Sequence, residues 1–250
     1  MAIIDFHTHI LPGIDDGSRN IESSLIMLQE ESRQGIDVVV VTPHFYASEV
    51  SVEVYLERRQ KAYDKLVEAI DELKQKAQAQ DDEPVKIPKI LLGAEVTYFE
   101  DISRADKISE LVMEGTDILL LEMPFKSWTR EEFDEVMEMI ESGDYQIMLA
   151  HLERFAAFRG NRKYIKELFQ TDAIIQYNSD SFHNRKYTKL MIKSMKKGIV
   201  PLLGSDCHGV HHRVPELLTG RNMLKDKMGQ EMLDQIDEKG TAILSHICHI

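Results

Sequence analysis

Two histidines one residue apart, in the stretch IIDFHTHILPGIDDGS (residues 3–18), are the first side chains that could do chemistry. His7 and His9 follow a short apolar run, and a turn with Asp15 and Asp16 comes after them. Side chains alternate along a strand, so residues i and i+2 point to the same face and two imidazoles there could bind one cation. A hydrogen-bonded polar strand end has the same pattern, so this stretch alone leaves a metal site and a polar turn open.

Imidazole and carboxylate side chains also follow other short apolar runs. Glu95 and Glu122 are the most informative, because a buried carboxylate is costly unless a cation or hydrogen bonds compensate it. Six strand ends together carry the candidate metal ligands His7, His9, Asp16, His44, Glu95, Glu122, His151, Asp206 and His208. This mixture suits Mn, Fe or Zn better than a thiolate-selecting site. Nine ligands are too many for one ion, so we expect two or three divalent ions.

The elements that must position these side chains alternate between strands and helices. Seven apolar runs have the length of strands buried on both faces: AIIDF, DVVVVT, KILLGA, DILLLE, YQIMLA, AIIQY and IVPLLGS. Helical periodicity is found between them, in segments 21–34, 52–79, 129–142, 161–171 and 186–198. Thr129 and Glu132 form a capping box at one helix start, and Gly35 and Gly198 are placed to end two helices.

A parallel α/β sheet follows from this alternation, because parallel strands need crossover connections and the helices supply them. In a closed barrel all carboxyl ends of the strands converge on one face, whereas an open sheet spreads them along an edge. Six strand ends with ligand-type residues therefore favour a barrel, closed or nearly closed. A length of 250 residues with 43% hydrophobic content predicts one domain, residues 1–250.

The amino-acid composition limits the kinds of partner that the protein can bind. The formal net charge of −13 argues against nucleic acid, which is bound through clustered Lys and Arg. The basic stretch RGNRKYIK (159–166) runs against this sign but is typical of a solvated helix face. No run is long and apolar enough to predict membrane insertion. Two cysteines, Cys207 and Cys248, are too few for a disulfide framework, which suits a cytoplasmic location, and nothing in the sequence indicates an oligomeric state.

The chain resembles the PHP (polymerase and histidinol phosphatase) superfamily over nearly its whole length. The resemblance rests on HTH (7–9), TPH (42–44), GAE (93–95), AH (150–151) and SDCH (205–208). Within that superfamily, HILPGIDDGS, LLLEMP and AHLERF are similar to the manganese-dependent protein-tyrosine phosphatases of bacterial capsule and exopolysaccharide loci. The resemblance implies a distorted (β/α)7 TIM-like barrel, the PHP fold, with a trinuclear cluster in which Mn is the expected metal and Fe or Zn the alternatives.

The resemblance also implies a role for each candidate. One metal takes His7, His9, Glu95 and Asp206, a second shares Glu95 and adds Glu122 and His151, and a third takes Asp16, His44 and His208. Asp15 is then left to support a ligand or the turn. Arg154 in HLER and Arg213 after SDCHGVHH match the two catalytic arginines of the family's phosphate pocket, and a guanidinium fork suits phosphate better than a lysine does.

The implied activity is hydrolysis of phosphotyrosine by a hydroxide that bridges two metals, because cations lower the pKa of bound water. The implied partner is a phosphotyrosine-containing protein, the tail of a membrane-associated bacterial tyrosine kinase that controls polysaccharide export. Two alternatives within the same superfamily remain: a small-molecule phosphatase acting on histidinol phosphate, and a catalytically silent metal-bound module that docks a partner.

A rival mechanism is present in the same segment. CHGVHHR has the Cys-x5-Arg spacing of cysteine-dependent tyrosine phosphatases, with Cys207 as nucleophile and Arg213 as clamp. Asp206 argues against it, since a neighbouring carboxylate raises the pKa of a thiol.

Three further side chains have two interpretations each. His211 and His212 could form a substrate rim or supply the leaving-group acid, but solvated loop histidines have the same pattern. Trp128, with Phe125, could stack on a phosphotyrosine ring or form a hydrophobic lid.

Overall fold

The computed structural model describes residues 1–248 and side chains through Ser245, so Cys248 lies outside the described side chains. The strands are β1 (Ile4–Thr8), β2 (Val38–Val41), β3 (His44–Phe45), β4 (Lys89–Leu92), β5 (Glu95–Thr97), β6 (Ile118–Glu122), β7 (Gln146–Leu149), β8 (Ile174–Asn178) and β9 (Leu202–Gly204). The α-helices are α1 (Ile21–Arg33), α2 (Val52–Ala79), α3 (Arg130–Ser142), α4 (Leu152–Phe155), α5 (Asn161–Leu168), α6 (Arg185–Met195), α7 (Leu217–Met228) and α8 (Gln230–Cys248). Three 3-10 helices are η1 (Ile102–Arg104), η2 (Ile108–Leu111) and η3 (Asp180–His183).

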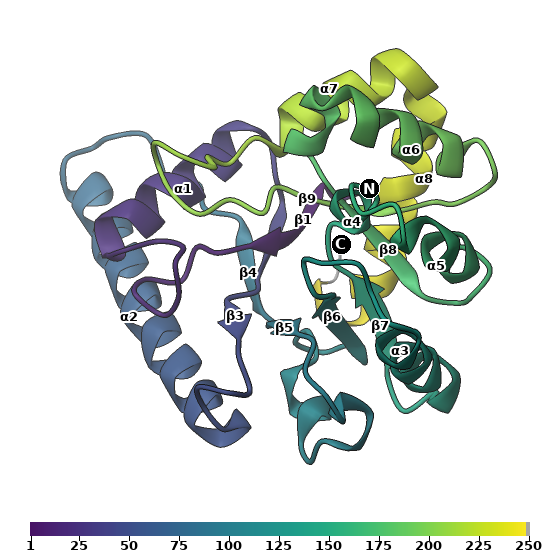
Figure 1. Cartoon of the computed structure of the whole chain (residues 1–250). Helices are drawn as coiled ribbons and strands as arrows, with labels where there is room; N and C mark the ends of the chain where they lie inside the picture. The colour runs from purple at the N-terminus through teal and green to yellow at the C-terminus, as the bar shows by residue number, and fades with distance from the viewer. Residues whose placement is uncertain (249–250) are drawn as a thin grey trace.

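Parallel strands curl into a ring with helices around it (Figure 1). Hydrogen bonding gives the strand orders β1-β2-β4 and β3-β5-β6-β7-β8-β9. β3 continues β2 after a break at Pro43, which has no N–H to donate, and β5 continues β4 after Gly93 and Ala94. The nine strands thus correspond to the seven that were predicted.

The ring closes where β1 meets the end of β9. The backbone N–H of His9 donates to the carbonyl oxygen of Cys207 at 2.9 Å, and that of Asp206 donates to the carbonyl oxygen of His7 at 2.7 Å. The predicted fold class, a distorted barrel of seven parallel strands, is confirmed. That residues 1–250 form a single domain stays a prediction.

Alternate positions on the strands build the barrel interior. One buried cluster collects side chains from the strands around the ring: Ile4, Phe6, Val38, Val40, Leu91, Ile118, Leu120, Met148, Ile174 and Leu202. Toward the carboxyl ends, the same alternation makes the interior polar, because Glu122 follows Leu120 and Gln176 follows Ile174 by two residues. The sequence therefore fills one end of the barrel with apolar side chains and the other with polar ones.

Helix ends were predicted with small errors. The capping box of Thr129 and Glu132 starts α3, and Gly35 and Gly198 follow α1 and α6 in left-handed backbone, with φ of 77° and 95°. α5 ends at Leu168 instead of residue 171, and α6 covers Arg185–Met195 instead of 186–198. In both cases the last residues of the predicted helix form a turn. α7 and α8 were not predicted. No helix among the described residues is both long and apolar enough to cross a membrane.

Candidate metal centre

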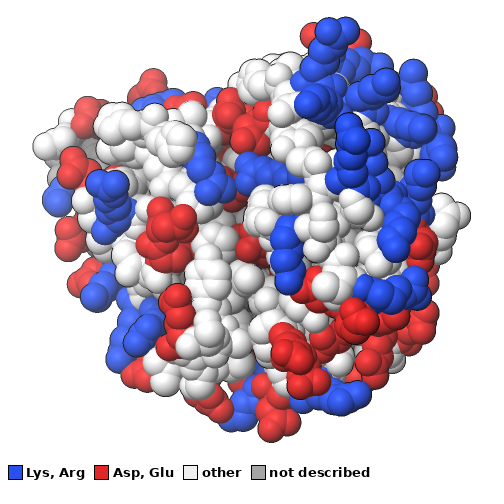
Figure 2. All heavy atoms as spheres, viewed as in Figure 1, with Lys and Arg blue, Asp and Glu red and all other residues white. Residues whose placement is uncertain are grey.

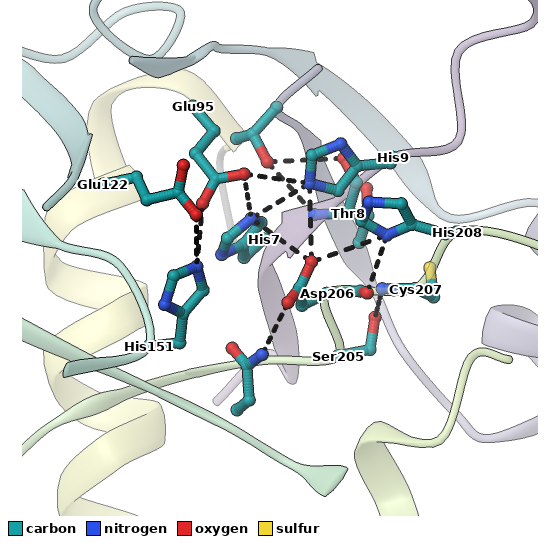
Figure 3. Close-up of polar contacts among 12 residues, drawn as sticks. His7, Thr8, His9, Glu95, Glu122, His151, Ser205, Asp206, Cys207 and His208 are labelled. Atoms are coloured by element: carbon teal, nitrogen blue, oxygen red, sulfur yellow. Dashed lines mark hydrogen bonds and ion pairs between the residues drawn. The ribbon is translucent and has the colours of Figure 1, made fainter. Parts of the chain in front are cut away.

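Side chains from six strand ends meet at the polar end of the barrel. Figure 3 shows His7, His9, Glu95 and Asp206 pointing toward one another, with Glu122 and His151 on one side and His208 on the other. His7 lies on β1, Glu95 begins β5 and Glu122 ends β6. The predicted convergence is therefore present, and nearly all of these side chains are buried.

Glu95 is the centre of this cluster. Its Oε2 atom lies 3.1 Å from Nε2 of His7, 3.2 Å from Nε2 of His9 and 3.0 Å from Nδ1 of His44. Its Oε1 atom lies 3.0 Å from Nε2 of His151. One carboxylate thus faces four imidazoles, so it can share its two oxygens between neighbouring cations.

The two histidines of the HTH motif do point to one place. Their Nε2 atoms lie 3.1 Å apart. Oδ1 of Asp206 lies 3.6 Å from Nε2 of His7 and 3.5 Å from Nε2 of His9. The opposite ring nitrogens have other partners, since Nδ1 of His9 contacts Asp15 at 2.7 Å and Nδ1 of His7 contacts Gln176 at 3.3 Å. These contacts leave both Nε2 atoms directed into the cluster, as metal-ligating histidines require.

Groups of side chains close enough to hold an ion agree in part with the assignments that the resemblance implies. The groups are His7, His9 and Glu95; His44, Glu95 and Glu122; and His9, Asp16, His44 and His208. The third contains the whole expected set of Asp16, His44 and His208 and adds His9. In the second group, His44 stands where His151 was expected, although His151 lies 3.0 Å from Glu95 and 3.4 Å from Glu122.

Several buried polar atoms of the cluster have no hydrogen-bond partner among the described residues. Oε2 of Glu95, Nδ1 of His44 and Nε2 of His208 are in this state. Oε2 of Glu95 and Nδ1 of His44 are only 3.0 Å apart, yet their directions do not suit a hydrogen bond. Buried polar atoms normally have partners, so atoms that face shared points in space fit bound cations. The donor set therefore fits divalent metals.

Protonation of the imidazoles reports how strongly the cluster attracts cations. Burial lowers the pKa of His9, but the neighbouring carboxylates of Asp15 and Glu95 outweigh it and raise the pKa to about 10. Burial likewise lowers the pKa of His151, but Glu122 and Glu95 raise it to about 10. The carboxylates thus draw positive charge onto buried rings, and a divalent cation would meet the same attraction.

Asp206 is held by both predicted arginines. Nη1 of Arg154 lies 2.9 Å from its Oδ2 atom, and Nη2 of Arg213 contacts its Oδ1 atom. Burial raises the pKa of Asp206, but His7 and Arg213 outweigh it and hold the pKa below its usual range. Both guanidiniums keep partial contact with solvent, so they lie at the mouth of the cluster where an anion can reach them.

Three of the six non-glycine residues with left-handed backbone among the described residues lie at this site. His151, Asp206 and Arg213 have φ of 31°, 53° and 49°, in the left-handed region that residues with a side chain avoid. Such conformations persist where the surrounding structure imposes them, and functional sites are where they gather. Here the turns after β7 and β9 aim side chains back across the end of the barrel.

β8, the one strand for which no ligand was predicted, supports the ligands of its neighbours. Gln176 accepts a hydrogen bond from the backbone N–H of His151 at 2.6 Å and contacts Nδ1 of His7. Asn178 donates to Oδ2 of Asp206 at 2.7 Å and accepts from Gln176 at 2.8 Å. Gln176 and Asn178 have the same i, i+2 spacing as His7 and His9. In the sequence, this spacing was the signal that both side chains point to the same face as the ligands.

The structure decides between the interpretations that the sequence left open for Trp128, His211 and His212. Trp128 is 5% exposed and donates through Nε1 to the carbonyl oxygen of Pro124, so it is a core residue and cannot stack on a ligand. Phe125 is instead 54% exposed, with its ring centroid 5.6 Å from that of His151. His211 and His212 are exposed loop residues.

Cys207 does not have the surroundings of a nucleophile. Its side chain is fully buried, and Sγ lies 3.9 Å from Oε1 of Glu31. Burial, together with Glu31 and Asp5, raises the pKa of the thiol well above its ordinary value. Reactive cysteines need a lowered pKa and access to substrate, so the geometry contradicts the cysteine mechanism.

Comparison with known proteins gives consistent matches over almost the full length. The sequence model of a family described as "Capsular polysaccharide synthesis, CpsB/CapC" matches residues 3–244. Tyrosine-protein phosphatase CpsB of Streptococcus agalactiae is 23% identical over 94% of this chain and 94% of its own. Tyrosine-protein phosphatase YwqE of Bacillus subtilis is 25% identical over 97% of this chain and 91% of its own.

A solved structure has the same fold. It comes from work on YwqE of Bacillus subtilis and CpsB of Streptococcus pneumoniae, described there as unique metal-dependent tyrosine phosphatases. The TM-score is 0.76 with 22% identity, covering 97% of this chain and 94% of the other.

Proposed function

We propose that this chain, which belongs to the CpsB/CapC family of capsular polysaccharide synthesis, is a metal-dependent protein-tyrosine phosphatase. The observation that carries the proposal is the gathering of imidazoles around Glu95, with two arginines directed at Asp206 beside it. The tyrosine-phosphatase names of relatives that match over 90% or more of both chains support the substrate class.

The ligands we propose for two or three divalent ions are His7, His9, Asp16, His44, Glu95, Glu122, His151, Asp206 and His208. Manganese is the ion we expect, with iron or zinc as alternatives, because the donor set contains only imidazole and carboxylate. When bound, these ions supply Lewis acidity, which activates water and neutralises phosphoryl oxygens.

Arg154 and Arg213 would bind the phosphate at the mouth of the cluster. Arg154 is also fixed by Asp180, whose Oδ2 atom lies 3.2 Å from Nη2. A planar guanidinium can hold two phosphoryl oxygens at once and keeps its charge at any physiological pH. We therefore assign both arginines to phosphate binding and to stabilising charge on the phosphoryl oxygens during hydrolysis.

Two aromatic side chains beside the cluster favour an aryl phosphate. Phe125 lies next to His151, and the exposed ring of Tyr46 stacks on His44 with centroids 5.3 Å apart. Aromatic pairs contribute about 0.5–1.5 kcal/mol beyond burial of their area. A phosphotyrosine whose phosphate meets the arginines would place its phenyl ring at this rim.

The substrate we expect is a phosphotyrosine-containing protein, in the first place the tail of a membrane-associated bacterial tyrosine kinase. The family's link to capsular polysaccharide synthesis supports this partner. A cytoplasmic location is part of the same proposal.

Metal analysis of the purified protein, combined with activity on a phosphotyrosine peptide, tests the proposal. We expect at least two divalent ions per chain, loss of activity on chelation and recovery when manganese is added back. Histidinol phosphate, assayed in parallel, should be the poorer substrate. Chelator-resistant activity or fewer than two ions per chain would contradict the metal mechanism, and absence of any phosphomonoesterase activity would favour a silent docking module.

A further inference from the structure

A basic region stands out on this acidic protein. Residues 159–197 hold ten of the chain's 30 Lys and Arg but only three of its 43 Asp and Glu. Figure 2 shows Lys and Arg side chains gathered over the part of the molecule that carries α5, α6 and α7 in Figure 1. The local charge is thus opposite to the net charge of −13.

A groove runs between α5 and α6 within this region. Its volume is about 760 Å³, and its apolar floor includes Ile165, Phe169 and Leu190. Seven cations line it: Arg159, Arg162, Lys166, Lys186, Lys189, Lys193 and Lys197. We call it the α5–α6 groove. No Asp or Glu is among the described residues that line it.

Some exposed cations elsewhere on the protein are paired with carboxylates, whereas those of the α5–α6 groove are not. Lys61, Lys126 and Arg130 each pair with a nearby carboxylate. Within the described residues, none of the seven groove cations forms an ion pair. Lys186, Lys189 and Lys193 also follow one another at helical spacings of three and four, so they repel each other along α6. An anionic partner would relieve that repulsion.

The groove begins next to the proposed phosphate site. Arg154 is on α4, and Ala156 and Ala157, directly after that helix, line the groove. Asp180, which binds Arg154, begins η3, and η3 leads into α6. Short stretches of chain therefore connect the residues of the phosphate site with those of the groove.

We infer that the α5–α6 groove binds an acidic segment of the substrate, on one side of its phosphotyrosine. This inference rests on the proposed function and adds a sequence preference to it. The eleven residues of α6 span roughly 16 Å at 1.5 Å per residue, which is the length of about five extended residues. The partner is thus a short stretch rich in Asp and Glu, whose apolar side chains contact the floor.

Shape favours a peptide over a membrane surface. The lining residues form a concave surface, whereas a bilayer presents a flat one. The large apolar side chains that are exposed in the described chain are Met1, Ile26, Tyr46, Val54, Phe125, Val214 and Leu218. All of them lie outside α5 and α6, so the basic region offers no protruding apolar group for insertion.

The test measures the activity of the manganese-loaded protein on two sets of phosphotyrosine peptides. In one set a five-residue segment is mostly glutamate, and in the other it is mostly glutamine. Each set places the segment either before or after the phosphotyrosine. We expect kcat/KM to be at least about tenfold higher for a glutamate peptide, and the advantage to shrink as salt screens the charges. The double variant Lys189→Glu/Lys193→Glu should remove the advantage and leave the glutamine peptides unaffected. The control Lys65→Glu/Lys74→Glu makes the same charge change at exposed positions on α2 and should keep the advantage.

Binding of an unphosphorylated glutamate peptide, labelled with fluorescein and measured by anisotropy, separates this inference from the proposed function. If this peptide binds and the Lys189/Lys193 variant loses the binding, the groove is supported. Absence of hydrolysis of every phosphotyrosine peptide would then overturn only the phosphatase assignment. Equal kcat/KM for glutamate and glutamine peptides would overturn the groove. The inference would also be overturned if the protein bound only phosphatidylglycerol vesicles or an oligonucleotide, and the Lys189/Lys193 variant lost that binding.

Discussion

Nδ1 of His9 lies 2.7 Å from Oδ2 of Asp15, so a carboxylate outside the ligand set holds a ligand of the metal centre. Asp15 also accepts hydrogen bonds from the backbone N–H groups of Gly17 and His44, both at 2.9 Å. The pKa of Asp15 is lowered, because the hydrogen bond and the charge of His9 outweigh its burial. Asp15 is therefore a positioning residue that acts through His9 and the backbone of His44.

Replacing Asp15 with Asn should weaken metal binding without removing a ligand. Loss of such a supporting carboxylate typically costs about 10- to 100-fold in metal affinity or activity. Titration of the chelated variant with manganese, followed by metal analysis, measures the affinity. We expect full activity to return at high manganese, since the ligands remain, whereas Asp16→Asn should lower the number of ions bound. Unchanged manganese affinity in Asp15→Asn would contradict the positioning role.

Much of this architecture was accessible from the sequence, because local patterns encode it. Strands of the ring read as continuous apolar runs, since both of their faces are buried. Ligand-type residues such as Glu95 and Glu122 stood out because they directly adjoin those runs. The alternation of strands and helices then limited the topology to parallel arrangements.

The parts that could not be predicted depend on contacts between distant segments. Gln176 contacts His7 at a separation of 169 residues, and no local pattern reports that contact. Trp128 was open to two interpretations because its burial depends on Phe155 and Tyr164, which come later in the chain. The left-handed backbone of His151 and Asp206 is imposed by the packed barrel end; His and Asp adopt it more often than most residue types, but that preference is too weak to identify these two positions from the sequence.

Substitution of Cys207 with Ser should leave the chemistry in place. The thiol is buried and its pKa is raised, so it contributes packing and not nucleophilicity. We expect the metal content to be unchanged and kcat on a phosphotyrosine peptide to stay within about threefold, because removal of a true nucleophile costs orders of magnitude. Arg213→Lys is the positive control, since both mechanisms use that arginine. Near-total loss of kcat in Cys207→Ser with metals still bound would restore the cysteine mechanism.

Phe125 should contribute to selection of aromatic substrates. Its exposed ring lies 5.6 Å from His151 and 4.8 Å from Phe155, so it can contact a phenyl ring at the rim. We expect Phe125→Ala to raise KM for phosphotyrosine peptides by about 2- to 10-fold, the equivalent of one aromatic contact. KM for a phosphoserine peptide should not change. Ile26→Ala, at an exposed position on α1, is the matched control, and an equal rise in KM for both peptides would argue against a contact with the phenyl ring.

The chelated protein should lose stability as pH rises from 6.5 to 10. His9 and His151 have folded pKa values of about 10, whereas an imidazole in an unfolded chain titrates near 6.5. The folded state then binds protons that the unfolded state has released, so their stabilising contribution is complete below pH 6.5 and is lost as pH approaches 10.

A contribution of 1 kcal/mol corresponds to roughly 2–4 °C in Tm for a chain of this size. Thermal unfolding in chelator should therefore show a falling Tm over this range, and manganese-loaded protein a flatter profile, since metal binding requires neutral imidazoles. His9→Gln, which cannot titrate, should reduce the slope in chelator. A Tm that stays level or rises in chelator would show that these two imidazoles are not protonated in the folded protein.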